Sequence, residues 1–117
     1  MLLRVLLTVA LLAGLAPSVH AQTRLKSVAT LSILADLLRE VGGDRVETTV
    51  LVGSDTDAHS YQPRPTDARV LAGAQVLVSN GRGFEGWVAR LAEAAQFKGT
   101  HVVATSGIPG RDPHCWQ

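Results

Sequence analysis

The sequence predicts an α/β fold: a single lobe with a four-stranded, mostly parallel sheet flanked by helices. Two observations support this prediction. Short apolar segments alternate along the chain with segments in which apolar residues recur at helical spacing. The strand candidates are also mostly apolar, without the polar–apolar alternation of a half-exposed strand, which is typical of parallel strands covered on both faces.

The N-terminus has the pattern of a secretory signal peptide. Arg4 precedes an apolar run over residues 5–16, and residues 19–21 (VHA) form a small-residue cleavage pattern. The run is about half of the roughly 20 residues that a membrane-spanning helix needs. We therefore expect residues 1–21 to be removed and residues 22–117 to form one periplasmic domain; the alternative is an uncleaved N-terminal helix.

The processed chain is expected to carry no net charge. The whole chain has 11 basic and 10 acidic side chains, and processing removes Arg4. This balance implies neither a nucleic-acid partner nor an anionic-membrane partner. Cys115 is the only cysteine, so the chain offers no intrachain disulfide and no cysteine at the processing site to carry a lipid. These features fit a soluble protein of an extracytoplasmic compartment.

The first half of the domain is predicted to begin with a strand, a helix and a second strand. Residues 27–30 form the first strand, Ser32 is the candidate N-cap of the helix, and Gly42-Gly43 is its stop signal. Residues 46–52 (VETTVLV) are rich in β-branched side chains and form the second strand. The apolar face of the helix comprises Leu34, Leu37, Leu38 and Val41.

The second half repeats this alternation. Thr66 can cap a short helix that continues through Gly73, with Asp67 in the first turn, where the helix dipole favours a negative charge. Residues 76–78 form the third strand and residues 101–104 the fourth. A second helix between these strands has the clearest amphipathic stripe in the sequence, formed by Phe84, Trp87, Val88, Leu91, Ala92 and Ala95.

Two histidines are predicted to lie near one edge of the sheet. Ligands of open parallel sheets bind beyond the carboxyl ends of the strands. His59 follows the second strand and His114 follows the fourth, so both loops can lie on that rim. His101 opens the fourth strand, where a solvated or capping role is expected.

The segment around His59 reads SDTDAHSYQPRPTDA. Pro63 and Pro65 restrict its backbone, which lowers the entropy cost of holding a side chain in place. Asp55 and Asp57 could accept a hydrogen bond from the imidazole nitrogen that is not bound to metal. Local chemistry alone leaves two interpretations open, a metal ligand and a surface histidine.

The loop around His114 also contains a proline, Pro113, and a cysteine. Cys115 could pair with His114 on a metal or act as a thiol nucleophile. Neighbouring residues of an extended chain point to opposite sides, so a shared metal would require a sharp bend.

Two other sequence patterns resemble ligand-binding motifs, but the residues around them do not fit those motifs. Residues 81–86 (GRGFEG) match the dinucleotide-binding pattern, but they follow the third strand, and no acidic residue ends the next strand. Turn geometry and close packing explain these glycines more simply. Asp55 and Asp57 could begin a calcium loop, but Ser60 and Thr66 stand where that loop needs glycine and glutamate.

Four segments together cover nearly all of the processed chain and carry a family resemblance. They are VATLSILADLLREVGGDRVETTVLVG, DAHSYQPRPTDARVLAGAQVLVSNG, GFEGWVARL and DPHCWQ. With them the chain resembles the N-terminal lobe of the cluster A-I solute-binding proteins of zinc and manganese ABC importers.

The resemblance implies a site for Zn²⁺ or Mn²⁺ as bound solute, in a cleft between two lobes. The histidine of the H-x-Y-x-P-x-P segment corresponds to His59 and that of the D-P-H-x-W segment to His114. The third ligand, a histidine or glutamate, and the fourth, an aspartate, are implied to come from a C-terminal lobe that this sequence lacks. We therefore expect a truncated or partial, non-enzymatic family member, a monomer whose partner is the membrane permease of a metal ABC importer.

Several alternatives stay open at this point. The choice between zinc and manganese depends on ligands outside this sequence, and the role of Cys115 is undecided. An exported zinc-dependent hydrolase could use Asp55 or Asp57 as its base. The chain could also be an inert remnant lobe, and the sequence does not show whether such a lobe folds or binds metal alone.

Overall fold

The computed structural model describes residues 22–109. The predicted signal peptide over residues 1–21, the predicted ligand His114 and Cys115 lie outside the described residues. None of the helices in the described part is long and apolar enough to span a membrane.

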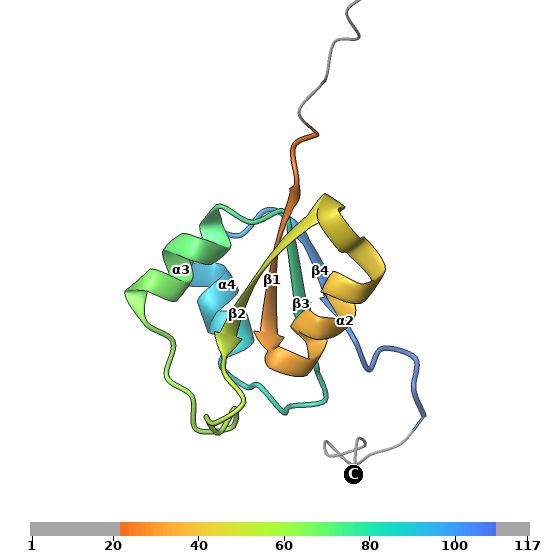
Figure 1. Ribbon diagram of the computed structural model, residues 1–117. Helices are drawn as coiled ribbons and strands as arrows, with labels where there is room; N and C mark the ends of the chain where they lie inside the picture. The colour runs from red at the N-terminus through yellow and green to blue at the C-terminus, as the bar shows by residue number, and fades with distance from the viewer. Residues whose placement is uncertain (1–21, 110–117) are drawn as a thin grey trace, which may run out of the picture.

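The predicted fold class is confirmed (Figure 1). Four parallel strands form one sheet in the order β2-β1-β3-β4, with β1 and β3 in the interior. In chain order the elements are β1 (Leu25–Leu31), α2 (Ser32–Gly42), the short 3-10 helix η2 (Gly43–Arg45), β2 (Val46–Val52), α3 (Pro65–Ala72), β3 (Val76–Ser79), α4 (Val88–Ala94) and β4 (Thr100–Val103).

Helices cover both faces of the sheet, as apolar parallel strands require. Figure 1 shows α2 on one side of the sheet and α3 with α4 on the other. The core on the α3–α4 side is the larger and contains Val28, Val52, Leu71, Leu77, Trp87, Val88 and Leu91. The core under α2 contains Ala29, Leu34, Ala35 and Val78.

The strands agree with the prediction except at their ends. The first strand begins earlier than predicted, because Leu25 and Lys26 pair with Val46 and Glu47 although both are exposed. The last strand is displaced by one residue and ends at Val103. Pairing of backbone groups, which apolar patterning does not report, sets these ends.

Helix α2 differs from the prediction in its N-cap and in the burial of its apolar face. Ser32 is its first residue and Leu31 occupies the N-cap position without a side-chain cap, so the predicted cap is wrong. The predicted stop is confirmed, with Gly43 at a φ of 52° after the last turn. Leu37 is 54% exposed and Val41 82% exposed, because the helix packs on the sheet mainly through Leu34 and Ala35.

Helices α3 and α4 also begin at other residues than predicted. Proline is the first residue of α3 and Arg64 the N-cap, so a cap by Thr66 is wrong, whereas Asp67 in the first turn is confirmed. Helix α4 begins only at Val88, so Phe84 and the residues up to the helix form a turn-rich segment.

Candidate metal site

The loop of His59 lies between β2 and α3, at the carboxyl end of β2. Asp57 closes this loop, since its Oδ1 accepts the backbone N–H of His59 at 3.0 Å and its Oδ2 accepts the Ser60 hydroxyl at 2.8 Å. The Ser60 hydrogen bond first, and the His59 N–H second, hold the pKa of the Asp57 carboxyl below its ordinary value. Asp57 therefore shapes the backbone that presents the imidazole, and both its oxygens already accept bonds from the loop.

Trp87 anchors the loop of His59 through a buried hydrogen bond. Its indole Nε1–H donates to the carbonyl of Ala58, directly before His59, at 2.8 Å. Both residues are buried, with Ala58 6% and Trp87 3% exposed. A buried carbonyl that loses its donor carries a desolvation cost, so this bond holds the loop against the α3–α4 layer.

Tyr61 ties the other side of the loop to the start of α3. Its hydroxyl donates to Asp67 Oδ2 at 2.8 Å, and the same oxygen accepts the backbone N–H of Arg64 at 2.7 Å. Burial first, and the bond to Asp67 second, raise the pKa of the Tyr61 phenol. The Tyr61 ring lies 5.0 Å from the Trp87 ring, between centroids. The predicted rigidity of this segment thus has a second source besides its prolines.

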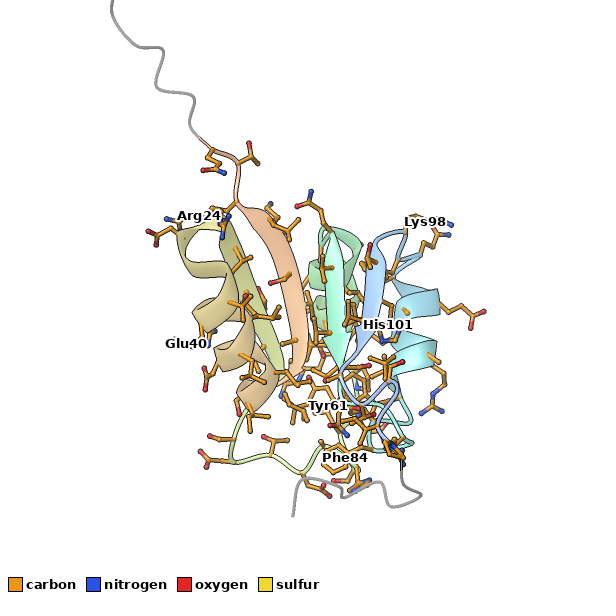
Figure 2. All side chains as sticks on the ribbon, turned by 90° about the vertical axis from the view of Figure 1, so that its right-hand side faces the viewer. Arg24, Glu40, Tyr61, Phe84, Lys98 and His101 are labelled. Atoms are coloured by element: carbon orange, nitrogen blue, oxygen red, sulfur yellow. The ribbon has the colours of Figure 1, made fainter. Side chains whose placement is uncertain are left out.

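Phe84 meets the imidazole of His59 from the segment after β3. The two ring centroids are 4.5 Å apart and the rings are tilted by 52°. Figure 2 shows Tyr61 and Phe84 together at one end of the molecule and Arg24 and Lys98 at the other. The loops after β2 and β3 therefore meet on one rim, as strand polarity predicts.

Glu85 fixes the segment that carries Phe84. It is 6% exposed, and its carboxylate accepts the backbone N–H groups of Asn80 at 2.9 Å and Gly81 at 3.0 Å. The Thr30 hydroxyl donates to the same carboxylate. The N–H groups at this turn, which a nucleotide phosphate would need, are thus bound to Glu85, which explains in physical terms why the glycine motif is no dinucleotide site.

Sequence reasoning missed this role of Glu85. The available signal was an acidic residue shortly after the end of a buried strand, where backbone N–H groups lose their sheet partners. Gly81 is required at the same turn, because its φ is +89° and an added Cβ would lie 2.3 Å from Val103 Cγ1.

The chain after β4 leaves the sheet at the same rim. Thr105 is 3% exposed, and its hydroxyl donates to the Asn80 carbonyl at 2.7 Å. Arg82 donates to the Ile108 carbonyl. These contacts hold residues 105–108 beside the segment that carries Phe84.

His101 is separate from this cluster. It lies in β4, and its Nε2 shares a 2.8 Å hydrogen bond with the Ser79 hydroxyl of β3. Within residues 22–109 no three His, Cys, Asp or Glu side chains are grouped so that they could hold a metal ion. The described part thus supplies one of the two predicted ligands, His59.

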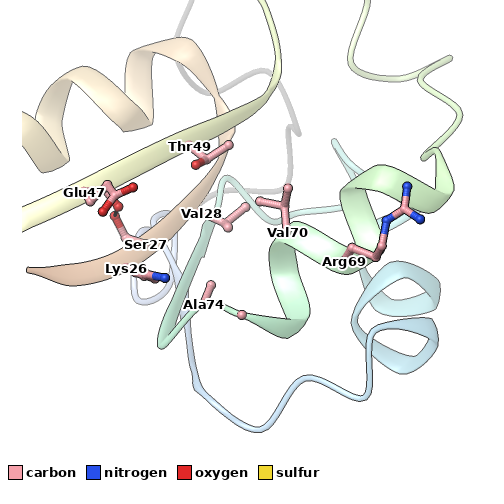
Figure 3. A pocket seen from close by; sticks show the side chains of 9 residues that line it. Lys26, Ser27, Val28, Glu47, Thr49, Arg69, Val70 and Ala74 are labelled. Carbon is pink, nitrogen blue, oxygen red and sulfur yellow. Dashed lines mark hydrogen bonds between the residues drawn. The ribbon is translucent and has the colours of Figure 1, made fainter.

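A cavity of about 260 Å³ lies away from the rim (Figure 3). Lys26 and Glu47, near the amino ends of β1 and β2, face it together with Val70 of α3. Its position at the opposite ends of the strands separates it from the loop of His59.

Comparison with known proteins gives the family. Residues 28–117 match the family described as the periplasmic component A of the zinc-uptake complex. The chain belongs to this family. The predicted resemblance is confirmed, and it extends over the loop of His59 and the terminal segment.

Individual relatives are consistent with this membership. The chain is 34% identical over 99 residues to the manganese-binding lipoprotein MntA of Halalkalibacterium halodurans, covering 79% of this chain and 33% of the relative. It is 30% identical to the manganese ABC transporter substrate-binding lipoprotein PsaA of Streptococcus mitis, covering 97% of this chain and 42% of the relative. The chain thus spans about a third of the length of MntA.

Solved structures share the fold. The crystal structure of ZnuA matches with a TM-score of 0.72 at 28% identity, over 80% of this chain and 40% of that one. Zn(II)-bound AdcA from Streptococcus pneumoniae matches with a TM-score of 0.68 at 26% identity, over 80% of this chain and 22% of that one.

Proposed function

We propose that this chain is the N-terminal lobe of an extracytoplasmic solute-binding protein of an ABC importer, with Zn²⁺ or Mn²⁺ as its solute. His59 and His114 are the metal ligands that the chain contributes. The names of its relatives support this assignment, because MntA is called manganese-binding and AdcA was solved with Zn(II) bound. The lobe acts as a monomer in the periplasm, and its partner is the membrane permease of the importer.

The observation that carries the proposal is the fixed presentation of His59 on the rim. Asp57 bonds the backbone at His59, Trp87 bonds the residue before it, and Phe84 packs on the imidazole. A side chain held in this way loses little further freedom when it binds an ion. Imidazole nitrogen suits zinc and neighbouring divalent ions.

The function needs no catalytic group. A solute-binding protein captures its ion and releases it unchanged, so nucleophiles and bases have no part in its action. This agrees with the hydrogen bonds that lower the pKa of the Asp57 carboxyl, because a carboxylate of lower pKa is a weaker base.

Two histidines supply half of a tetrahedral zinc shell. We therefore expect weak zinc binding by this chain, with water in the remaining positions. A C-terminal lobe with a histidine or glutamate and an aspartate would complete the shell.

Isothermal titration of zinc into the exported, processed chain tests the assignment. Loss of an outer-shell partner alone costs about 10- to 100-fold in metal affinity, so loss of a ligand in His59→Ala or His114→Ala is expected to cost at least about tenfold. His101→Ala is the matched control and is expected to bind as the parent does, because His101 bonds Ser79 within the sheet. Equal zinc affinity in the parent and all three variants would refute the ligand assignment.

A further inference from the structure

A second hollow lies outside the rim, along the seam between α3 and α4. Its volume is about 370 Å³, within the range of pockets that bind small molecules or side chains. Its floor is mostly apolar: Pro65 and Ala94 are exposed there, and the buried Trp87 and Leu91 lie at its base. We call this hollow the α3–α4 groove; the proposed metal ligands do not line it.

The charged side chains that line the α3–α4 groove are both basic. Arg64 and Arg90 line it, and no aspartate or glutamate does. The one ion pair found within residues 22–109 lies on α2, so in the described part neither guanidinium has an acidic partner. Both arginines are exposed, and their donors are free to meet an acidic group that enters the groove.

Apart from the two arginines, the groove offers few hydrogen-bond donors. Pro63 and Pro65 line the groove and have no backbone N–H. Gln62 also lines the groove, and its side-chain amide can donate hydrogen bonds. An occupant therefore finds an apolar floor with strong, positively charged donors beside it. This arrangement selects a group that combines apolar surface with a carboxylate.

We propose that the α3–α4 groove is a docking site for an acidic, partly apolar segment of a partner protein. Carboxylates of the segment pair with Arg64 and Arg90 through charge-assisted hydrogen bonds, which the planar guanidinium group forms in bidentate geometry. Apolar side chains next to these carboxylates pack on the exposed apolar lining residues, Pro65 and Ala94. Recognition of acidic segments by paired arginines on a concave surface is a recurrent mode of peptide binding.

The position of Trp87 joins this docking site to the loop of His59. The indole that forms part of the groove floor is the same group that donates to the Ala58 carbonyl. A single side chain, that of Trp87, therefore lies between an occupant of the groove and the loop backbone that presents His59. The docking site itself does not require metal, so its test is independent of the proposed function.

The test uses a pair of short peptides as probes. The acidic probe is acetyl-Leu-Asp-Phe-Glu-Leu amide, and the neutral probe replaces its Asp and Glu with Asn and Gln. Each is titrated, without metal, into the ¹⁵N-labelled processed chain and followed by ¹H–¹⁵N correlation spectra. Trp87 lines the groove, so its indole N–H, which is bonded to the Ala58 carbonyl, serves as a nearby reporter of groove occupation.

The acidic probe is expected to shift the Trp87 indole and the amides of α3 and α4 in a saturable way. The neutral probe is expected to bind at least about tenfold more weakly, since it lacks hydrogen bonds to charged partners. Arg64→Gln and Arg90→Gln are each expected to weaken the acidic probe, and the double variant to do so by at least about tenfold. Arg69→Gln is the matched control, because Arg69 lies on α3 but lines the other cavity, and it is expected to change nothing.

Three results would overturn the proposal: no saturable shift with millimolar acidic probe, equal binding of both probes, or full binding by the double variant. Spectra of the free variants that overlay on those of the parent establish that the fold is intact. If the double variant does not fold, the two single variants decide the question, because full acidic-probe binding in both contradicts the proposed role of the arginines.

Discussion

Replacing Glu85 with glutamine tests how the rim is built. The Glu85 carboxylate accepts three hydrogen bonds, from the N–H groups of Asn80 and Gly81 and from the Thr30 hydroxyl. Glutamine keeps one oxygen, and its amide nitrogen must then face at least one of these donors. The change keeps the volume of the side chain and removes acceptor capacity at a buried position.

The loss can be worked out from these contacts. A hydrogen bond to a charged group contributes about 1.5–3 kcal/mol, and the two bonds that remain weaken because neutral bonds are roughly half as strong. We expect the free energy of unfolding to fall by about 3 kcal/mol. For a domain of this size that corresponds to a melting temperature roughly 12–24 °C lower.

Thermal unfolding followed by circular dichroism measures this loss. Glu93→Gln is the matched control, since Glu93 is an exposed residue of α4 and its substitution is expected to cost no more than about 0.5 kcal/mol. The reasoning is refuted if Glu85→Gln melts within about 4 °C of the parent, or if both variants lose the same amount.

Two further substitutions test the same architecture by thermal unfolding. Gly81→Ala is expected to be clearly more destabilising than Gly83→Ala: both glycines have positive φ, but only at Gly81 does an added Cβ meet a neighbour, 2.3 Å from Val103 Cγ1. Equal losses would show that steric contact at Gly81 is unimportant. Trp87→Phe removes the donor to Ala58 and is expected to cost about 1–3 kcal/mol, with faster amide exchange in the loop of His59. Unchanged exchange in that loop would contradict the role of Trp87 as its anchor.

The sequence predicts the layers of this fold well because they depend on local periodicity. Apolar runs bounded by glycine and polar residues mark β2 and β3, and helical spacing marks α2 and α4. The ends of these elements depend on contacts that local patterns do not contain. Helix α4 begins at Val88, after Phe84, because the preceding segment turns Glu85 inward onto the end of β3.

The candidate site divides in the same way. The position of His59 after a strand and the prolines that follow it mark this residue as a candidate, and the family resemblance favours a ligand over a surface histidine. Its supports come from distant parts of the chain: Trp87 is 29 residues from Ala58, and Glu85 is 55 residues from Thr30. Neither spacing follows a motif. The sequence predicts that Asp57 assists the imidazole, and the structure adds a second role, because this carboxylate also closes the loop by accepting the backbone N–H of His59.

Metal binding by His59 and His114 is tested most directly by observing the histidine rings themselves during zinc binding. Residues 22–117 contain three histidines, His59, His101 and His114. Long-range ¹H–¹⁵N correlation spectra of the processed chain resolve their ring nitrogens during a zinc titration. The ring resonances of His59 and His114 are expected to shift together with a single binding curve, while those of His101 keep their positions. Zinc binding that leaves the His59 ring unchanged, or that shifts His101 equally, would contradict this expectation.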